Sequence, residues 1–139
     1  MSDLRIRHAA FSDIDTVLRF WRDAAEGTSI SDDHDGVAGL IARDPEALLL
    51  ALRDDLLVGT VIAGFDGWRC SAYRLAVHPG LRRQGIATAL LQAAEQRFAA
   101  LGGRRVDAMV LEANGRAHHT WAARGYLRED HWRRWVKPL

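Results

Sequence analysis

A basic turn at residues 82–88 has the residue types and the spacing to bind a phosphate group. The short, mostly apolar run Leu-Ala-Val-His-Pro at 75–79 predicts a strand that ends at Pro79, because proline cannot donate a hydrogen bond to a sheet. The turn reads Arg-Arg-Gln-Gly-Ile-Ala-Thr, and Gly85 lets the backbone come close to a ligand. Helically spaced apolar residues follow at Ile86, Leu90, Leu91, Ala94, Phe98 and Leu101. The unpaired amide groups at the start of such a helix point together and predict an anion site.

The spacing of residues in this turn excludes two common phosphate-binding motifs. A P-loop has a Lys-Ser/Thr pair after its second glycine, and this chain has none there. The dinucleotide-binding fingerprint needs three glycines at fixed spacing, and only Gly85 falls within the turn. The remaining pattern, Arg82-x-x-Gly85-x-Ala87, resembles the turn with which the GNAT superfamily of acyl-CoA-dependent N-acyltransferases holds the pyrophosphate of coenzyme A.

A second segment, from Asn114 to Tyr126, resembles the GNAT stretch Asn-x-x-Ala-x-x-x-Tyr-x-x-x-Gly-Phe. Asn114 suits the N-cap of one short helix, and Gly125 suits the residue that follows its C-terminus. The opening residues 4–7 and 11–15 resemble the first strand and first helix of the family, so the resemblance covers nearly the whole chain. Trp121 stands where the family has the tyrosine that often protonates the leaving thiolate.

The resemblance implies an α+β fold of the GNAT type, with a mixed and mostly antiparallel central sheet flanked by about four helices. It also implies direct transfer of an acetyl group from acetyl-CoA, the co-substrate, to an amine of a small molecule or protein, without a metal. The implied cofactor-binding residues are Leu75, Ala76, Val77, Arg82, Arg83, Gln84, Gly85, Ile86, Ala87, Thr88 and Asn114, the last on the pantetheine arm. The catalytic candidates are Tyr73, His118 and Trp121.

Acyl transfer to nitrogen needs a route for the proton of the amine, whose ordinary pKa is about 8 for an α-amino group and about 10.4 for lysine. Met109 stands where the protein N-terminal acetylases of the superfamily place a glutamate. Glu112 lies on the same expected strand, where it is either a base or a solvent-exposed residue. Asp66 and Tyr73 are expected close to the cleft, and Tyr73 also suits a core aromatic, so the base stays open. The resemblance assigns the donor for the tetrahedral oxyanion to a backbone amide at Val77 or its neighbours.

The leaving thiolate has an ordinary pKa of about 8.5, so an acid helps its departure without being indispensable. The indole of Trp121 donates a hydrogen bond but passes no proton at neutral pH. His118 lies three residues earlier on the same helical face and is the candidate donor. The alternative is a solvent-exposed His118, with Trp121 packed beside the pantetheine arm.

Alternating elements with short connections are expected along the rest of the chain. A helix opens near Ser12, with Asp15 three residues later as in a capping box, and a weaker helix covers 37–42. Further strands are expected at 48–52, 57–65, 68–77 and 106–113, the first two joined by an Arg53-Asp54-Asp55 hairpin turn. From Tyr126 onward the chain is expected to be extended.

Length and composition fit a single domain, which the resemblance implies is one GNAT N-acetyltransferase domain over residues 1–139. The chain is 48% hydrophobic, enough for a sizeable core. It has no charge-free apolar run close to the roughly 18 residues that a membrane span needs, and its N-terminus lacks the apolar core of a signal peptide. A soluble, cytoplasmic protein with no membrane partner is therefore expected. Cys70 is the single cysteine, which excludes an intramolecular disulfide and cysteine-rich zinc spacing.

Charged residues are unevenly distributed between the two halves of the sequence. Residues 1–56 sum to −6 and residues 57–139 to +7, which gives the net charge of +1. A basic second half suits the phosphates of coenzyme A. The acidic run Asp32-Asp33-His34-Asp35 either attracts a cationic acceptor or is a solvated loop.

Other classes of function fit parts of the sequence. The replacement at Trp121 also fits a GNAT module that binds acyl-CoA as a sensor without turnover. Alternating aromatic and basic residues at 131–137 are typical of nucleic-acid binding, but a closing strand with buried tryptophans is favoured, and no nucleic-acid partner is expected. His118 and His119 would point about 100° apart on a helix, which disfavours a metal site with His131. The acceptor and the oligomeric state, including a homodimer, stay open.

Overall fold

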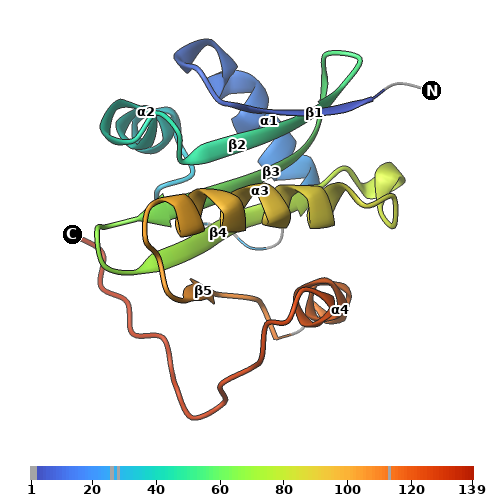
Figure 1. Ribbon diagram of the computed structural model, residues 1–139. Coiled ribbons are helices and arrows are strands. Elements are labelled where there is room, and N and C mark those ends of the chain that lie inside the picture. The colour runs from blue at the N-terminus through green and yellow to red at the C-terminus, as the bar shows by residue number, and fades with distance from the viewer. Residues whose placement is uncertain (1–2, 26, 28, 113) are drawn as a thin grey trace.

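Five strands form the central sheet of the computed structural model, which describes residues 3–25, 27, 29–112 and 114–139. They are β1 (Leu4–His8), β2 (Leu48–Arg53), β3 (Leu56–Phe65), β4 (Cys70–Val77) and β5 (Val106–Ala108). The strands lie side by side in chain order, antiparallel from β1 to β4, whereas β4 and β5 are parallel. The expected mixed, mostly antiparallel sheet is therefore confirmed (Figure 1).

Helices cover both faces of this sheet. They are α1 (Ile14–Ala24), α2 (His34–Arg43), α3 (Ile86–Ala100) and α4 (Gly115–Ala123), and Figure 1 shows α3 lying across one face with α1 behind the sheet. The buried strand β2 contributes to both cores, because successive side chains of a strand point to opposite faces. Leu48, Leu50 and Leu52 pack with α1 and α2, whereas Leu49 and Ala51 pack with α3. No helix in the described part of the chain is long and apolar enough to cross a membrane.

Side chains of helix α3 lie directly over Gly59 of β3. A methyl group on Gly59 would lie 2.9 Å from Ile86 Cγ2 and 2.9 Å from Leu90 Cδ1. These side chains begin the predicted helical stripe, which is buried as far as Phe98, while Leu101 lies beyond the helix and is exposed. The absent side chain at Gly59 therefore sets how closely α3 can lie on β3.

The predicted hairpin turn between β2 and β3 is confirmed. Asp54 and Asp55 have φ angles of 52° and 60°, the left-handed backbone that a two-residue hairpin turn requires. The strand expected from residue 68 begins at Cys70, because Asp66 holds the preceding turn. Its carboxylate accepts the amide hydrogens of Trp68 at 2.8 Å and Arg69 at 2.7 Å.

Two expected boundaries are wrong. Ser12 does not cap α1, because Phe11–Asp13 form a 3₁₀ turn in which the Asp13 carboxylate accepts the Ala10 amide hydrogen at 2.7 Å. The strand expected at 106–113 ends at Ala108, where β4 bends away and no longer offers it a partner. Residue 113 lies outside the described residues.

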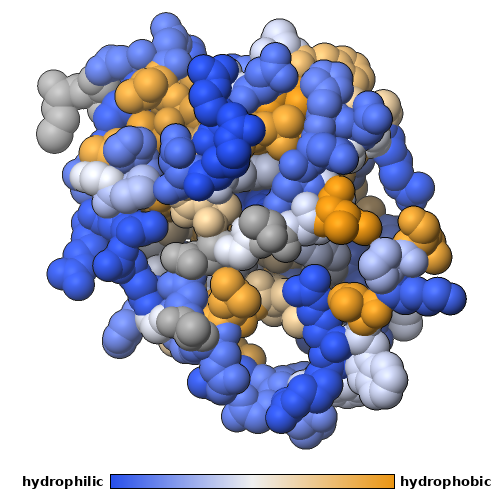
Figure 2. Space-filling view, turned by 180° about the vertical axis from the view of Figure 1, so that it is seen from behind, coloured by the Kyte–Doolittle hydropathy of each residue, from blue (hydrophilic) through white to orange (hydrophobic). Residues whose placement is uncertain are grey.

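The segment after Tyr126 contradicts the expected closing strand with buried tryptophans. Residues 127–139 are exposed and contain no strand, and Trp132 and Trp135 are 68% and 93% exposed. In Figure 2 an opening is visible at the bottom of the molecule, where Figure 1 shows this segment passing below β5. Because β5 has only three residues, it offers few edge groups with which such a strand could pair.

Candidate functional site

The basic turn at 82–88 leads directly into α3, as the sequence predicts. Gly85 is the N-cap residue of α3 and has a φ of +79°, in the left-handed region that favours glycine. Beyond its immediate neighbours, no described atom lies within 4 Å of the position that its Cβ would take. Arg83 also has a positive φ, of 65°. The turn is therefore sharply folded and open on the Gly85 side.

The amide groups at the start of α3 are directed at this open side. The helical hydrogen bonds begin with the Ala89 N–H and the Gly85 carbonyl oxygen, at 3.0 Å. The amide groups of residues 86–88 precede that bond, so no helical carbonyl faces them. Gln84 fixes the turn to β2, since its Oε1 accepts a hydrogen bond from Arg53 at 2.9 Å. Together with the helix dipole, this arrangement favours an anion.

Strand β4 contains a bulge immediately before the turn. Thr60 pairs with Ala76 and Ile62 pairs with Tyr73, so residues 74 and 75 of β4 oppose the single residue 61 of β3. Arg74 adopts a φ of 51°, which is uncommon for a residue with a side chain. A bulge bends the strand that contains it. Strand β4 accordingly pairs with β5 only over Cys70–Ala72 and then diverges from it.

Side chains from the opposite face hold this bulge in place. The buried Thr60 hydroxyl donates to the Arg74 carbonyl oxygen at 2.8 Å and accepts from the Trp21 indole N–H at 2.9 Å. The Arg74 guanidinium forms an ion pair with Asp32 and donates to the Gly27 carbonyl oxygen at 3.3 Å. Helix α1 and the loop that follows it therefore determine the shape of β4.

The divergence of β4 from β5 opens a cleft of about 100 Å³. The cleft is lined by Ala25, Ala72, Arg74, Leu75, Met109, Val110, Leu111, Asn114, Ala117 and Trp121. The His78 amide donates to the Val58 carbonyl oxygen of β3 at 2.9 Å, and alternate residues of an antiparallel strand bond to the same neighbour. The Val77 amide therefore points away from β3, towards the opening.

Helix α4 provides the wall beside β5. Asn114 is its N-cap, as predicted, and the Asn114 Oδ1 accepts the Ala117 amide hydrogen at 3.1 Å. Gly125 has a φ of +93° and ends the helix, also as predicted. Trp121 is buried and meets the ring of Tyr126 edge to face, with the ring centroids 4.8 Å apart.

The hydroxyl of Tyr126 forms a hydrogen bond with α3. It donates to Glu95 of α3 at 2.9 Å, and Arg124 pairs with the same carboxylate. Burial, followed by the hydrogen bond to Glu95, raises the pKa of Tyr126. Tyr126 therefore stays protonated and joins α4 to α3.

The sequence over residues 11–126 matches the Acetyltransferase (GNAT) family. This chain belongs to that family. Acetyltransferase YE1169 of Yersinia enterocolitica serotype O:8 / biotype 1B is 34% identical over 111 residues, which cover 80% of this chain and 79% of that protein. This GNAT chain is an acetyl-CoA-dependent acyltransferase.

Solved GNAT structures share the fold of this acyltransferase. The PaiA N-acetyltransferase from Thermoplasma acidophilum, in complex with coenzyme A, superposes with a TM-score of 0.80 at 18% identity and covers 92% of each chain. Diaminobutyrate acetyltransferase EctA from Paenibacillus lautus gives a TM-score of 0.73 at 20% identity over 89% of this chain and 75% of its own. That structure contains L-2,4-diaminobutyric acid and coenzyme A.

The three catalytic candidates of this GNAT acyltransferase occupy different surroundings. Trp121 lines the cleft, while Tyr73 and His118 are not among its lining residues. The His118 Nε2 lies 3.0 Å from the Leu111 carbonyl oxygen, so this ring ties α4 to the segment after β5. Tyr73 is 49% exposed, and its ring edge lies 3.6 Å from the position that a Cβ on Gly64 would take.

The carboxylates considered as bases are not among the residues that line the cleft of this acyltransferase. Asp66 was expected beside the cleft, which is wrong, since it lies in the turn before β4. Amide hydrogen bonds from Arg69 and Trp68 lower the pKa of its carboxyl. The side chain of Glu112 is 87% exposed and pairs with Arg128 at 3.2 Å.

Two carboxylates of the acidic run take part in the fold itself. Asp32 pairs with Arg74, and Asp33 caps α2 by accepting the Gly36 amide hydrogen at 2.8 Å. The next two residues, His34 and Asp35, are exposed. Asp35 is therefore the carboxylate of this run that is neither paired with arginine nor capping α2.

Sequence reasoning missed the residues that shape the cleft. Thr60 places a hydroxyl group in an otherwise apolar strand. This is the one local signal in the sequence, because a buried hydroxyl needs a hydrogen-bond partner. Trp21 and Arg74 give no such signal, because their roles depend on contacts between segments far apart in the chain.

Proposed function

We propose that this chain is an N-acetyltransferase that moves an acetyl group from acetyl-CoA directly to an amine, with both substrates bound together. One observation carries the proposal: the anion-binding turn and the cleft lie at the same end of β4. A substrate with phosphates at one end and a thioester at the other fits this arrangement. The Val77 amide lies between the two features.

The residues of the turn suit the pyrophosphate of this substrate. The amide groups of Ile86, Ala87 and Thr88 would donate to it, and Arg82 and Arg83 would add positive charge. The open space at Gly85 accommodates the phosphate oxygens without a clash. Gln84 would act indirectly, by holding the turn against Arg53.

The cleft suits the pantetheine arm. The backbone of Leu75, Ala76 and Val77 would run alongside it in place of a neighbouring strand. Asn114 can donate to the arm through its Nδ2 atom, because the helix cap uses only Oδ1. Trp121 would pack against the thiol end, since its ring lines the cleft.

In the reaction, the amine nitrogen attacks the thioester carbon, the carbonyl oxygen becomes an oxyanion, and the C–S bond then breaks. The Val77 amide would donate to the oxyanion. The proton of the amine would leave through water, because the cleft lining contains no carboxylate, histidine or tyrosine among the described residues. We retain His118 and Tyr73, which do not line the cleft, as candidates for proton transfer.

The acceptor is proposed to be an amine of a small molecule or of a protein. The EctA neighbour is in complex with its substrate L-2,4-diaminobutyric acid and with coenzyme A, which supports an amine acceptor for this fold. The acidic run begins beside the cleft, because Asp32 pairs with the lining residue Arg74, and the exposed carboxylate of Asp35 would favour a cationic acceptor.

An acceptor screen with a thiol readout tests the proposal. We expect thiol release from acetyl-CoA to exceed the rate without acceptor for at least one amine, with the acetylated product detected by mass spectrometry. Tight binding of acetyl-CoA without acetylation of any amine would instead indicate a sensor. Absence of binding in calorimetry would reject the assignment of the turn and cleft.

A further inference from the structure

A second, larger cavity lies at the opposite end of β4. It has a volume of about 440 Å³, is open to solvent on one side, and lies between the β3–β4 turn and the connection from α3 to β5. Its lining residues are Phe65, Gly67, Trp68, Arg69, Leu101, Gly102, Arg104, Arg105 and Asp107. None of them lines the cleft between β4 and β5. The volume falls within the range of about 300–1,000 Å³ that is typical of small-molecule sites.

The charged groups of this cavity leave an excess of positive charge. Asp107 is shared by two arginines, with the Arg105 Nε at 2.9 Å and the Arg69 Nη1 at 3.7 Å. The nearby Asp66 directs its carboxylate at the amides of its own turn. Arg104 has no hydrogen bond or ion pair within the described part of the chain. One exposed guanidinium is therefore available to an anion.

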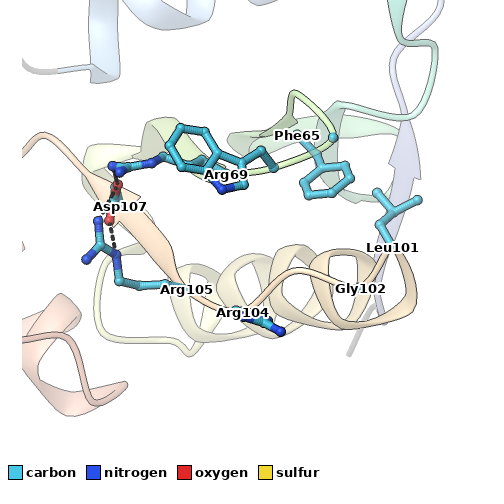
Figure 3. A pocket seen from close by; sticks show the side chains of 9 residues that line it. Phe65, Arg69, Leu101, Gly102, Arg104, Arg105 and Asp107 are labelled. Atoms are coloured by element: carbon cyan, nitrogen blue, oxygen red, sulfur yellow. Dashed lines mark hydrogen bonds and ion pairs between the residues drawn. The ribbon is translucent and has the colours of Figure 1, made fainter.

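The same cavity contains a large aromatic surface. Trp68 is 76% exposed although it lines the cavity, and the Arg69 guanidinium lies 4.5 Å from the centroid of its ring. This contact covers one face of the indole, while most of the Trp68 side chain stays accessible to solvent. Figure 3 shows Phe65 and Leu101 at one end of the cavity, and Arg69, Asp107 and Arg105 at the other. The cavity is therefore apolar at one end and cationic at the other.

We propose that this cavity binds a nucleoside monophosphate, with the base stacked on Trp68 and the phosphate on Arg104. Indole rings stack on bases of any kind, and guanidinium groups bind phosphate with paired hydrogen bonds. A free phosphate would leave the exposed indole of Trp68 uncovered, and a bare aromatic ring would leave the Arg104 guanidinium unpaired. The proposal is independent of the acetyl-transfer reaction.

Calorimetric titration with AMP tests this site. Coenzyme A also contains an adenine nucleotide, so the titration is made with coenzyme A at saturation and repeated with Gly85→Glu, in which the first site is altered. We expect AMP to bind in both cases. Adenosine and inorganic phosphate, titrated separately, should each bind at least about tenfold more weakly than AMP, because each makes only half of the contacts.

Substitutions within the cavity locate the binding. Arg104→Ala and Trp68→Ala should each weaken AMP binding about tenfold or more, whereas Trp68→Phe should retain most of it because it keeps a stacking surface. Both side chains are exposed, so circular dichroism and Tm should match those of the parent. Arg128→Ala, an exposed arginine outside the cavity, is the matched control.

Four results would overturn the proposal. The first three are the absence of AMP binding, AMP binding that is unchanged in both cavity variants, and phosphate or adenosine binding that equals AMP binding. The fourth is AMP binding that is lost both at saturating coenzyme A and in Gly85→Glu, because this would place the nucleotide at the turn before α3.

Discussion

Gly85 meets two requirements at one position, a left-handed backbone and an open side towards the proposed pyrophosphate. Any other residue would strain the backbone by about 1–2 kcal/mol. Asp13 acts in a similarly local way, because it joins β1 to α1 by accepting hydrogen bonds from Arg7 and from the Ala10 amide. Substitution of either residue therefore has a defined consequence.

For Gly85→Glu we expect coenzyme A binding to disappear from the micromolar range in calorimetry, because bulk and negative charge then face the phosphates. Stability should fall by about 1–2 kcal/mol from the backbone alone. Gly67→Glu is the matched control, since Gly67 has a φ of +95° and similarly open surroundings. It should lose comparable stability and keep coenzyme A. Equal loss of coenzyme A in both variants would show that the effect is not local.

For Asp13→Asn we expect a loss of about 1 kcal/mol of stability at neutral pH, measured by urea unfolding. The hydrogen bond from Arg7 lowers the pKa of Asp13 in the folded chain. A lowered carboxyl pKa stabilises the fold above the unfolded value of about 3.9, and this contribution disappears as the pH falls through the folded value. The difference between parent and variant should therefore shrink below about pH 4. A difference that is constant from pH 7 to pH 3 would contradict this assignment.

At the scale of elements, helix α3 has two roles. It packs on the sheet through Ile86 and Leu90, and its N-terminus faces the proposed pyrophosphate of coenzyme A. The position of that N-terminus depends on Gly59, over which both side chains lie. A small displacement of α3 would therefore also move the amide groups of the turn at 82–88.

For Gly59→Ala we expect a loss of about 1–3 kcal/mol of stability from overpacking. Coenzyme A affinity should fall as well, although the substituted residue does not line the turn. Gly64→Ala on the same strand is the control. Its new methyl group would lie 3.5 Å from the Ser71 carbonyl oxygen, an ordinary contact, so chemical unfolding and calorimetry should both stay near the parent values. Unchanged coenzyme A affinity in Gly59→Ala would show that the turn adjusts independently of the helix.

The elements that could be predicted from sequence are those with local causes. Helix α3 follows from its apolar periodicity, the β2–β3 hairpin from Asp54 and Asp55, and the ends of α4 from Asn114 and Gly125. The bulge in β4 could not be predicted, because Trp21 and Thr60 are 39 residues apart and meet only in the folded chain. The early end of β5 follows from the same bulge, and Ser12 was displaced as a cap by the stronger contacts of Asp13.

At the scale of the whole molecule, the charge imbalance between the two halves of the sequence is partly neutralised by folding. Asp32 pairs with Arg74, and both Asp44 and Glu46 pair with Arg97. Each of these ion pairs joins the acidic half to the basic half. The segment after Tyr126 is different, since its tryptophans are exposed instead of packed.

The exposure of the tryptophans in the segment after Tyr126 can be checked by fluorescence. Replacement of Trp132 and Trp135 by phenylalanine should remove much of the emission that acrylamide quenches, because both indoles are exposed. The remaining quenchable emission should come mainly from Trp68, since Trp21 and Trp121 are buried. Thermal unfolding should be unchanged. Quenching that is unaffected by the double substitution, or a lowered Tm, would show that the segment is packed in solution.

The chain from Trp21 through Thr60 to Arg74 has a kinetic consequence. Because buried groups of the core hold β4 apart from β5, folding itself prepares the groove for the pantetheine arm, and no separate opening step precedes entry. The observed association rate should then rise linearly with coenzyme A concentration in stopped-flow experiments, without a plateau set by an isomerisation. The bent strand thus makes the binding site a property of the resting protein.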